Sequence, residues 1–358
     1  MTESSRVWRR RILSWGAVLG VSVACQAAWG QMVLDGAGAT FPSKVYERWA
    51  REYERQRPGM SVRYAPTGSS DGVAKARQRA VLWAGTDAPL SAAQRAEHRL
   101  VQIPLVVGGL VPVVNLPGVA PNTLVLDGPV LAALMLGEIS QWNDVRVAAL
   151  NPGVRLPSLP VRRVVRSDGS GSSEVFSRYL GLVSAAFASK VPASTQPAWP
   201  GEPVRAKGND GVAEMVRTTA GAVSYVSFDR VARDRLTAVK LRTQDDASVA
   251  ASETAFRAAL LASDMYRKGD DEASLLAQPR RDAWPITATS FVLLDASPRD
   301  AAKAQAISRF VYWAFMHGDE LTRGTGFAPL PERVQARLAG RLLQIRLPDG
   351  KVPDLSAP

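Results

Sequence analysis

Short runs rich in valine, isoleucine and leucine alternate along this chain with stretches whose apolar residues recur at helical spacing. SVRYAP, from Ser61, and ITATSFVLL, from Ile286, are typical of strands, whereas Val45, Tyr46 and Trp49 fall on one helical face. This alternation is typical of α/β domains, in which helices cover a central sheet. The chain has 358 residues, of which 46% are hydrophobic, so it is long enough for two packed domains.

The most apolar run after the first thirty residues extends from Leu100 to Gly118 and is interrupted at Gly108 and Gly109. It predicts consecutive buried strands that cross between two lobes. Other segments follow the same alternation. Further predicted strands are Val33–Leu34, SLPVRRVV and GAVSYVSF. The first predicted helix begins at Pro42, and others are GVAKARQRAVLW, the helix whose apolar face is Val175, Phe176, Tyr179, Leu180 and Val183, and AKAQAISRFVYWAFMHG. The Pro-rich tail after Leu347 is predicted to be loose.

The first thirty residues differ from the rest, because a basic head, RVWRRR, precedes an apolar run that closes in small residues. This pattern predicts a secretory signal peptide, cleaved after Gly30. The segment from Arg9 to Leu13 also loosely fits a twin-arginine export signal. Cys25, the only cysteine, lies inside this segment, so the mature chain is expected to have no disulfide or thiol nucleophile. Lipid anchoring at Cys25 is the alternative.

The formal net charge is +11. Four arginines and one glutamate of the first thirty residues account for +3 of it, which leaves +8 on the remainder. Basic residues are spread evenly, without a run of five or an aromatic-basic stacking pattern, so we expect no nucleic-acid partner. A positive charge of this size would steer anions toward the protein.

Several predicted strand-to-helix junctions carry glycine, serine, threonine and aspartate. They are GAGATFP (36–42), TGSSDG (67–72), GTDAP (85–89) and RSDGSGSS (166–173). A helix N-terminus has unpaired N–H groups and a partial positive charge, so it can bind an anion, and hydroxyl groups add donors. The candidate donors are Thr40, Ser69, Ser70, Ser170, Ser172 and Ser173. For any one junction, ordinary helix capping explains the same residues.

Three charged residues accompany these junctions. Arg166 offers a planar fork for an oxyanion, and Asp168 either holds that guanidinium or caps the loop. Asp87 would repel a fully deprotonated anion, but an ionised carboxylate accepts a hydrogen bond from a P–OH group. Asp87 therefore predicts selection of phosphate over sulfate.

The common enzyme motifs are absent from the sequence. There is no G-x-x-x-x-G-K-[ST] loop, GAGATF ends in Phe41 where a dinucleotide fingerprint needs glycine, and Asp168 stands where G-x-S-x-G needs its first glycine. His98 and His317 are the only histidines, and neither has a second histidine at ligand spacing. We expect no cofactor, no metal site and no catalytic residues.

Taken together, these motifs resemble the periplasmic phosphate-binding proteins of high-affinity phosphate ABC transporters. The resemblance covers most of residues 33–294, in order. It is carried by GAGATFPSKVYERWA, GSSDGVA, GTDAPLS, PLVVGGLVPVVNLPG, LVLDG, LGEISQWND, LNPGVRLP, RSDGSGSSEVF, GNDGVAEMV, GAVSYV and DAWPITATSF.

The resemblance implies a two-lobed α/β fold of the type II periplasmic binding proteins, with the ligand in a cleft between the lobes. The expected division is a signal peptide at 1–30, lobe I at 31–108 and 285–347, lobe II at 109–284, and a C-terminal tail at 348–358. It also implies a periplasmic monomer that delivers phosphate to the membrane permease subunits of an ABC transporter.

The phosphate ligands implied by the resemblance come from both lobes. Thr40, Phe41 (through its backbone), Ser69 and Asp87 would belong to lobe I. Arg166, Ser170, Gly171 and Ser172 would close the site from lobe II. Asp168 matches the family aspartate that pairs with the arginine. Ser70 and Asp71 are supporting positions.

The sequence departs from the family pattern at two positions. Ser172 replaces the commoner threonine and keeps the hydroxyl, whereas Asp71 stands where the family usually has glycine. A carboxylate there could point to solvent, or could change the ligand, so a receptor or sensor for another oxyanion remains an alternative. A phosphate-ester hydrolase with Ser170 as nucleophile is the other alternative, although no base or metal site accompanies it.

Overall fold

The computed structural model describes residues 31–356. The predicted signal peptide, its cleavage site and Cys25 lie outside the described residues. Within residues 31–356, no helix is both long and apolar enough to span a membrane.

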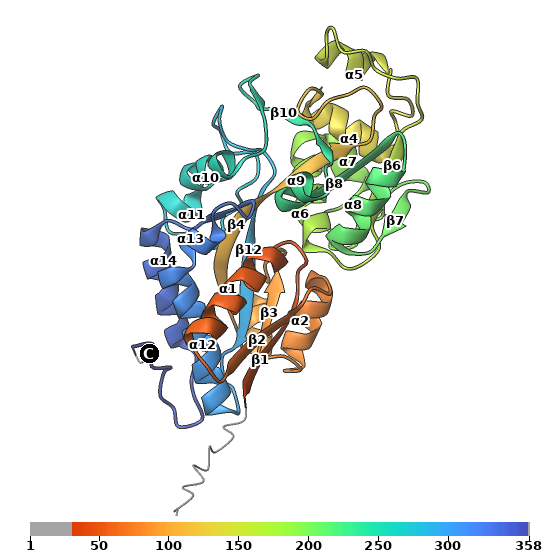
Figure 1. The fold of residues 1–358 in the computed structure, drawn as a ribbon. Coiled ribbons are helices and arrows are strands. Elements are labelled where there is room, and N and C mark those ends of the chain that lie inside the picture. The colour runs from red at the N-terminus through yellow and green to blue at the C-terminus, as the bar shows by residue number, and fades with distance from the viewer. Residues whose placement is uncertain (1–30, 357–358) are drawn as a thin grey trace, which may run out of the picture. The chain divides into compact units, whose positions relative to one another are not determined.

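The described residues form helices and strands in alternation (Figure 1). The strands are β1 (Met32–Gly38), β2 (Met60–Ala65), β3 (Trp83–Thr86), β4 (Leu100–Val114), β5 (Val125–Leu126), β6 (Arg162–Arg166), β7 (Val204–Ala206), β8 (Ala222–Ser227), β9 (Thr237–Ala238), β10 (Lys240–Arg242), β11 (Ser248–Val249), β12 (Thr287–Asp295) and β13 (Phe327–Pro329). The helices are α1 (Ser43–Gln56), α2 (Ser69–Arg77), α3 (Ala92–His98), α4 (Gly128–Leu136), α5 (Val145–Leu150), α6 (Gly171–Val183), α7 (Ala185–Lys190), α8 (Gly208–Thr218), α9 (Phe228–Arg233), α10 (Glu253–Ala262), α11 (Asp264–Arg267), α12 (Ala301–His317), α13 (Asp319–Thr322), α14 (Glu332–Ala339) and a 3₁₀ turn at Gly340–Gln344.

The main sheet has the strand order β2-β1-β3-β12-β4-β8-β6-β7. Strand β4 joins its two halves, because Leu100–Gly109 pair with β12 and Leu110–Val114 pair with β8. We call the half with β2, β1, β3 and β12 lobe I, and the half with β8, β6 and β7 lobe II. In lobe I, β1 runs parallel to β2 and β3, and in lobe II β6 runs parallel to β7 and β8. The expected α/β fold with two lobes is therefore observed.

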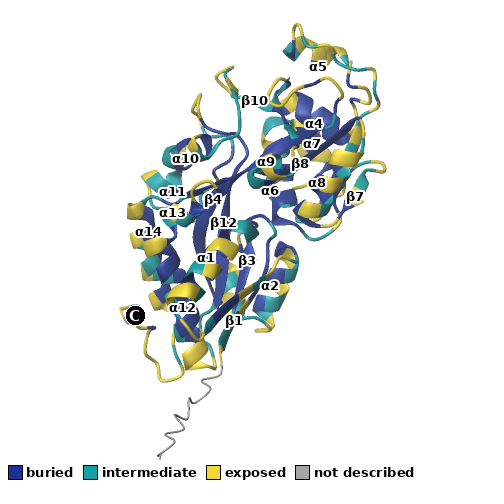
Figure 2. Ribbon diagram, in the orientation of Figure 1, coloured by how far each residue is buried: buried dark blue, intermediate teal, exposed yellow. Residues whose placement is uncertain are grey.

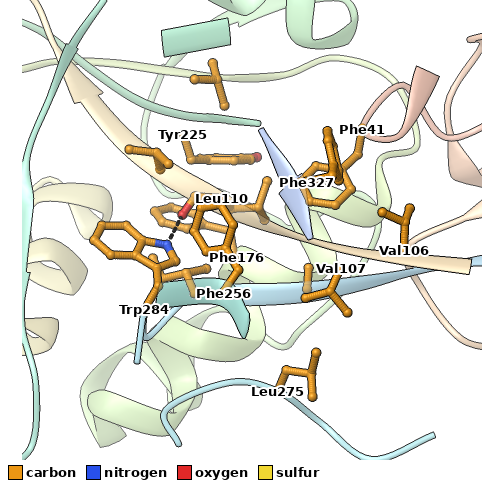
Figure 3. Close-up of a cluster of buried hydrophobic side chains, with 14 of the residues drawn as sticks. Phe41, Val106, Val107, Leu110, Phe176, Tyr225, Phe256, Leu275, Trp284 and Phe327 are labelled. Carbon is orange, nitrogen blue, oxygen red and sulfur yellow. Dashed lines mark hydrogen bonds between the residues drawn. The ribbon is translucent and has the colours of Figure 1, made fainter. Parts of the chain in front are cut away.

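The segment expected to form consecutive strands is one continuous strand of fifteen residues, β4, and every residue in it is buried. The two glycines do not break the strand, because they make room for aromatic rings. A Cβ atom on Gly108 would lie 2.6 Å from the Phe327 ring, and one on Gly109 would lie 2.1 Å from the Phe256 ring. Figure 3 shows these rings against β4.

The first predicted helix is confirmed as α1, and its predicted face, with Val45, Tyr46, Trp49 and Tyr53, is buried. Pro42 is the residue before the helix rather than its first residue.

The helix predicted over GVAKARQRAVLW begins earlier and ends at Arg77, as α2. It ends because Arg79 has a left-handed φ of 55°, and the N–H of Ala80 bonds back to the carbonyl of Lys75 at 2.9 Å. Trp83, which was expected in the helix, is instead in β3, where its ring stacks on that of Tyr64.

Buried residues follow the sheet through both lobes (Figure 2). In lobe II, the rings of Phe176 and Tyr225 stack with centroids 4.1 Å apart. Near the crossing of β4, Trp284 donates from Nε1 to the carbonyl of Leu110 at 2.9 Å (Figure 3). This continuous core fixes the strand ends from which the polar junctions project.

Residues 348–356 form no helix or strand, but they are not loose as expected. Asp354 donates from its backbone to Gln305 at 2.8 Å, and Arg309 donates to the carbonyl of Asp354 at 3.0 Å. The tail is therefore tied to α12.

Candidate functional site

The polar junctions of the sequence follow the carboxyl ends of parallel strands in the two lobes. Strands β1, β2 and β3 lead to the junctions of lobe I, and β6 leads to that of lobe II. Ligands of open α/β sheets bind at this end of the strands. Strand β7 leads to a further junction of the same kind, at Gly208 and Asn209 of α8.

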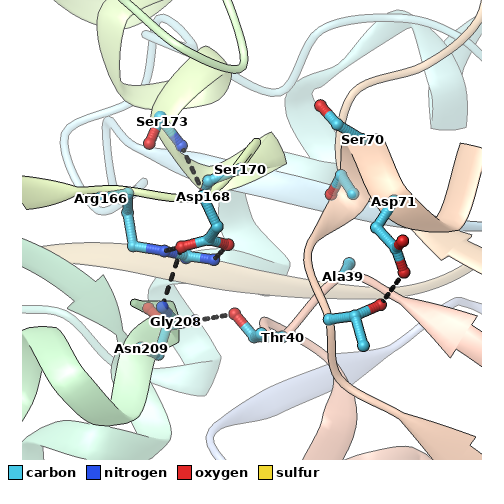
Figure 4. A network of polar contacts seen from close by, with 12 residues as sticks. Ala39, Thr40, Ser70, Asp71, Arg166, Asp168, Ser170, Ser173, Gly208 and Asn209 are labelled. Carbon is cyan, nitrogen blue, oxygen red and sulfur yellow. Dashed lines mark hydrogen bonds and ion pairs between the residues drawn. The ribbon is translucent and has the colours of Figure 1, made fainter. Parts of the chain in front are cut away.

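Arg166 is the last residue of β6, and its side chain is 1% exposed. It donates from Nε to Asp168 Oδ1 at 2.8 Å and from Nη2 to Asp168 Oδ2. The backbone N–H of Gly208 also donates to Asp168 Oδ1, at 2.9 Å (Figure 4). Burial alone would raise the pKa of Asp168, but the hydrogen bonds from Arg166 and Gly208 lower it below its ordinary value. Asp168 therefore stays ionised and fixes the guanidinium.

The remaining nitrogen of this guanidinium, Nη1 of Arg166, is buried and has no hydrogen-bond partner in residues 31–356. Nearly all buried polar atoms in proteins have a partner, because an unsatisfied one costs about 1–3 kcal/mol. A buried, charged donor held in place by Asp168 and left without an acceptor is typical of an anion site.

The start of α6 lies against the lobe I junctions. A Cβ atom on Gly171 would lie 2.5 Å from Ser69 Oγ and 2.8 Å from Asp87 Cβ. Only glycine fits this approach, which brings the first turn of α6 beside the first turn of α2. Ser172, the next residue, is 2% exposed.

Three hydroxyl groups at these junctions share one property: each accepts a hydrogen bond from an N–H group. Thr40 Oγ1 accepts from Asn209 Nδ2 at 2.9 Å, Ser69 Oγ from Asp87 N at 3.3 Å, and Ser170 Oγ from Ser173 N at 3.1 Å. A hydroxyl has a single proton. Each of these protons is therefore left to donate to another acceptor.

Phe41 follows Thr40 and has a different role for its side chain. The ring is 1% exposed and packs edge-on against Phe327, with centroids 4.8 Å apart. The ring therefore anchors the β1–α1 junction in the core, and only the backbone of Phe41 remains for a ligand.

Asp87 follows β3 and is 3% exposed. Its Oδ1 accepts a hydrogen bond from Ser290 Oγ at 2.9 Å. Burial raises the pKa of Asp87 to about 7, although the Ser290 hydrogen bond and the charge of Arg166 both lower it. In the ligand-free protein, the Asp87 carboxyl is therefore mostly protonated below about pH 7 and mostly ionised above it.

We expect the stability of the ligand-free protein to report this pKa. Because folding raises the pKa of Asp87, the stability that its proton contributes is fully present below about pH 4 and is lost as pH rises through about 7. Compared with wild type, Asp87→Asn should therefore be relatively more stable at pH 8 than at pH 5, by at most about 3 kcal/mol. Urea unfolding of both proteins at the two pH values measures this; an equal difference at both would contradict it.

Ser70 and Asp71 do not point at Arg166. Ser70 connects the lobes: its N–H donates to the carbonyl of Gly169 at 3.0 Å, and its hydroxyl donates to Thr195 Oγ1 at 3.0 Å. The Asp71 carboxylate accepts from Thr67 Oγ1 (Figure 4). It also forms an ion pair with Lys75 at 2.7 Å. Partial burial raises the pKa of Asp71, but the bonds from Lys75 and Thr67 lower it overall.

Sequence reasoning missed three residues that hold the site together. Asn209 supports Thr40, Ser290 supports Asp87, and Thr195 bonds to Ser70 while its carbonyl accepts from Ser170 N at 2.9 Å. The β7–α8 junction carries the same glycine and polar residues as the other junctions, so its composition could have identified Asn209. Ser290 lies inside a strand and Thr195 in an irregular loop, where no local pattern marks them.

In the described part of the chain, no group of three or more histidine, cysteine, aspartate or glutamate residues is placed to hold a metal ion. The chemistry that residues 31–356 assemble at the junctions is one guanidinium, several hydroxyl and N–H donors, and one carboxylate. This set can bind an oxyanion that carries a proton.

Comparison with known proteins places the chain in a family. The model of the PBP superfamily domain matches residues 26–316. The phosphate-binding protein PstS of Xylella fastidiosa is 35% identical over 298 residues, which cover 83% of this chain and 81% of that protein. PstS of Haemophilus influenzae is 34% identical over 302 residues, covering 84% and 90%.

Solved structures share the fold. A high affinity periplasmic phosphate-binding protein, PfluDING, bound with phosphate, superimposes with a TM-score of 0.69 at 20% identity, covering 86% of this chain and 93% of that one. The phosphate-binding protein from Stenotrophomonas maltophilia has a TM-score of 0.65 at 19% identity, covering 87% and 94%. The chain therefore belongs to the PBP superfamily, in the family of the PstS phosphate-binding proteins.

Proposed function

We propose that this protein binds inorganic phosphate between its lobes and delivers it to the permease of an ABC transporter. The observation that carries the proposal is the buried Nη1 of Arg166, which has no partner in residues 31–356 and lies in a guanidinium fixed by Asp168. The names of the relatives, phosphate-binding protein PstS, and the phosphate bound in PfluDING support the same ligand.

In this proposal, each site residue has a distinct contact with the anion. Arg166 supplies the charged donor, and the free protons of the Thr40, Ser69 and Ser170 hydroxyls donate to phosphate oxygens. Backbone N–H groups add to these, from Phe41 at the β1–α1 junction and from Gly171 and Ser172 at the start of α6, where the helix dipole also favours an anion.

Asp87 is proposed to recognise whether the ligand carries a proton. At pH 8 it is ionised, because its pKa is about 7. An ionised carboxylate accepts a hydrogen bond from the P–OH of HPO₄²⁻ but repels sulfate, which has no proton at this pH.

We further propose that residues 31–108 and 285–347 make up lobe I, residues 109–284 lobe II, and residues 348–358 the tail. The lobes would close on the ligand about the strands that connect them, because both contribute to one site. The proposed partners are phosphate and the permease subunits; the protein is proposed to act as a monomer and to bind no nucleic acid.

Retention of radiolabelled phosphate tests the binding function. The purified protein, freed of bound ligand by unfolding and refolding, should retain labelled phosphate on filtration. Excess unlabelled phosphate should displace it, whereas excess sulfate at pH 8 should not. Delivery is tested separately, by restoring phosphate-limited growth to a bacterium that lacks its own phosphate-binding protein. Failure to retain phosphate would refute the proposal.

We propose that the protein is exported to the periplasm with a signal peptide at residues 1–30. The basic head and apolar run of the sequence support export. Peptide sequencing of the exported protein should find Gln31 at the N-terminus, and a chain that begins at Met1 would contradict cleavage.

Asp71→Gly should leave phosphate affinity within about threefold of wild type. The reason is that the carboxylate is engaged by Thr67 and Lys75. The substitution should cost about 1 kcal/mol of stability, because it removes a negative charge from the first turn of α2 and its pair with Lys75, and because glycine is a slightly poorer helix former than aspartate. Calorimetric titration and urea unfolding measure the two effects, with Asp71→Asn as the control that keeps helix propensity closer to wild type. A change in the preferred anion would instead support the alternative of a receptor for another oxyanion.

We propose a binding role without catalysis. The relatives are named as binding proteins, and the Ser170 hydroxyl caps α6 by accepting a hydrogen bond from Ser173 N. A chromogenic phosphate ester tests the hydrolase alternative, and release of the chromophore in proportion to protein would contradict our proposal.

A further inference from the structure

Ser290 is a buried polar residue in the apolar strand β12. It is fully buried, between Thr289 and Phe291, and its hydroxyl donates to Asp87 Oδ1 at 2.9 Å. Asp87 is buried as well, so this hydrogen bond forms where water does not compete with it. The contact occupies one carboxylate oxygen and leaves Oδ2 for a ligand.

The other groups that face Asp87 come from several elements. Arg166 of β6 acts on it by charge, and the buried hydroxyls of Tyr46 and Tyr64 lie close enough to feel its charge. Arg178 and Glu272 line, together with Asp87, a cavity of about 210 Å³.

Among these groups, Ser290 is the neutral side chain that donates directly to the carboxylate. The guanidinium of Arg166 donates to Asp168 instead. The hydroxyl of Tyr64 donates to the carbonyl of Ala39 at 2.8 Å. The hydroxyl of Tyr46 has no partner with full hydrogen-bond geometry in residues 31–356. Burial raises the pKa of Tyr46, and a contact with Ser290 offsets a smaller part of this increase.

We propose that Ser290 is a positioning residue for ligand selection: its hydroxyl holds Asp87 as a hydrogen-bond acceptor and so sets the pH above which the site excludes sulfate. This inference rests on the proposed function. A donated hydrogen bond stabilises the ionised carboxylate. Without it, Asp87 keeps its proton to higher pH, and a protonated carboxyl can donate to a sulfate oxygen.

The test is the pH dependence of sulfate binding, measured by calorimetry from pH 5.5 to 9 with the full purified protein. In wild type, sulfate binding should strengthen as pH falls through about 7, where Asp87 gains its proton. In Ser290→Ala, the midpoint of this profile should rise by about one pH unit, so that sulfate binds about fivefold more tightly at pH 8 than it binds to wild type.

Two further variants keep the test decisive. Ser290→Cys keeps a side chain of similar size but is a weaker donor, so its midpoint should move in the same direction by less; it carries the test if Ser290→Ala does not fold. Thr289→Val is the matched control. It removes a neighbouring buried hydroxyl that has no partner in residues 31–356, and the wild-type profile should be retained.

The outcomes separate this inference from the proposed function. The inference would be overturned, with the proposed function intact, if wild type binds phosphate but the Ser290 variants show the same pH dependence of sulfate binding as wild type. A shift of equal size in Thr289→Val would also overturn it, because any lost hydroxyl would then suffice. A wild type that binds no phosphate at all would refute the proposed function itself.

Discussion

Arg166→Ala should weaken phosphate binding by at least about 1,000-fold. The substitution removes the buried guanidinium of the site and leaves Asp168, which is ionised in the folded protein, without the charge of Arg166 beside it. Removing one member of a buried, hydrogen-bonded charge pair typically costs 2–5 kcal/mol or more, much of it from the charge left behind, and about 4 kcal/mol corresponds to 1,000-fold. Calorimetric titration of phosphate at pH 8 measures the loss.

Two variants identify its source. Asp168→Asn in the Arg166→Ala background removes the stranded charge and should recover part of the lost affinity. Arg162→Ala, at an exposed position of the same strand, removes a positive charge without touching the site and should change affinity by less than about threefold. An Arg166→Ala protein that folds and binds phosphate within tenfold of wild type would contradict the proposed site.

Asp87→Asn should remove most of the discrimination between phosphate and sulfate at pH 8. The asparagine amide donates hydrogen bonds where the ionised carboxylate only accepts them, so the repulsion of an unprotonated oxygen disappears. Placing a sulfate oxygen against the buried carboxylate, with no proton between the two acceptors, costs about 3 kcal/mol. Removing this cost corresponds to about a 100-fold gain in the affinity for sulfate relative to phosphate. Most of the change should be a gain in sulfate binding, since the oxygen of a P–OH group can itself accept from the amide and phosphate therefore keeps a hydrogen bond at this position.

Competition against labelled phosphate gives both affinities in one experiment. Asp71→Asn is the matched control, because it neutralises another carboxylate of the same junctions, one that is paired with Lys75. It should keep the wild-type selectivity. If Asp87→Asn still excludes sulfate, Asp87 does not read the proton of the ligand, and selectivity must arise elsewhere.

The fold was largely predictable from local patterns. Apolar runs and helical spacing identified the strands β1, β2, β4, β6, β8 and β12 and the helices α1, α2, α6 and α12, including the buried face of α1, but they assigned Trp83 of β3 to a helix. The errors arose where tertiary contacts decide. Gly108 and Gly109 were interpreted as a break, yet they accommodate the rings of Phe327 and Phe256 within a continuous β4. Nothing local to those glycines identifies a ring that comes from a distant part of the chain.

The candidate site was predictable to the extent that its residues lie at strand-to-helix junctions. The structure places three of the predicted positions side by side, because Gly171 of lobe II lies against Ser69 and Asp87 of lobe I. The sequence could not predict which side chains form hydrogen bonds that orient the candidate ligand residues. Ser290 follows Asp87 by 203 positions, and Asn209 follows Thr40 by 169. Such pairs become apparent only when the lobes are folded and in contact.

Calorimetric titration of the ligand-free protein with phosphate, and separately with sulfate, at pH 8 tests the central claim most directly. Both anions are divalent at this pH and similar in size, and they differ in the single proton that Asp87 is proposed to recognise. We expect micromolar or tighter one-to-one binding of phosphate and no heat from sulfate. Equal binding of the two anions would contradict the role of Asp87, and no binding of phosphate would contradict the proposed function.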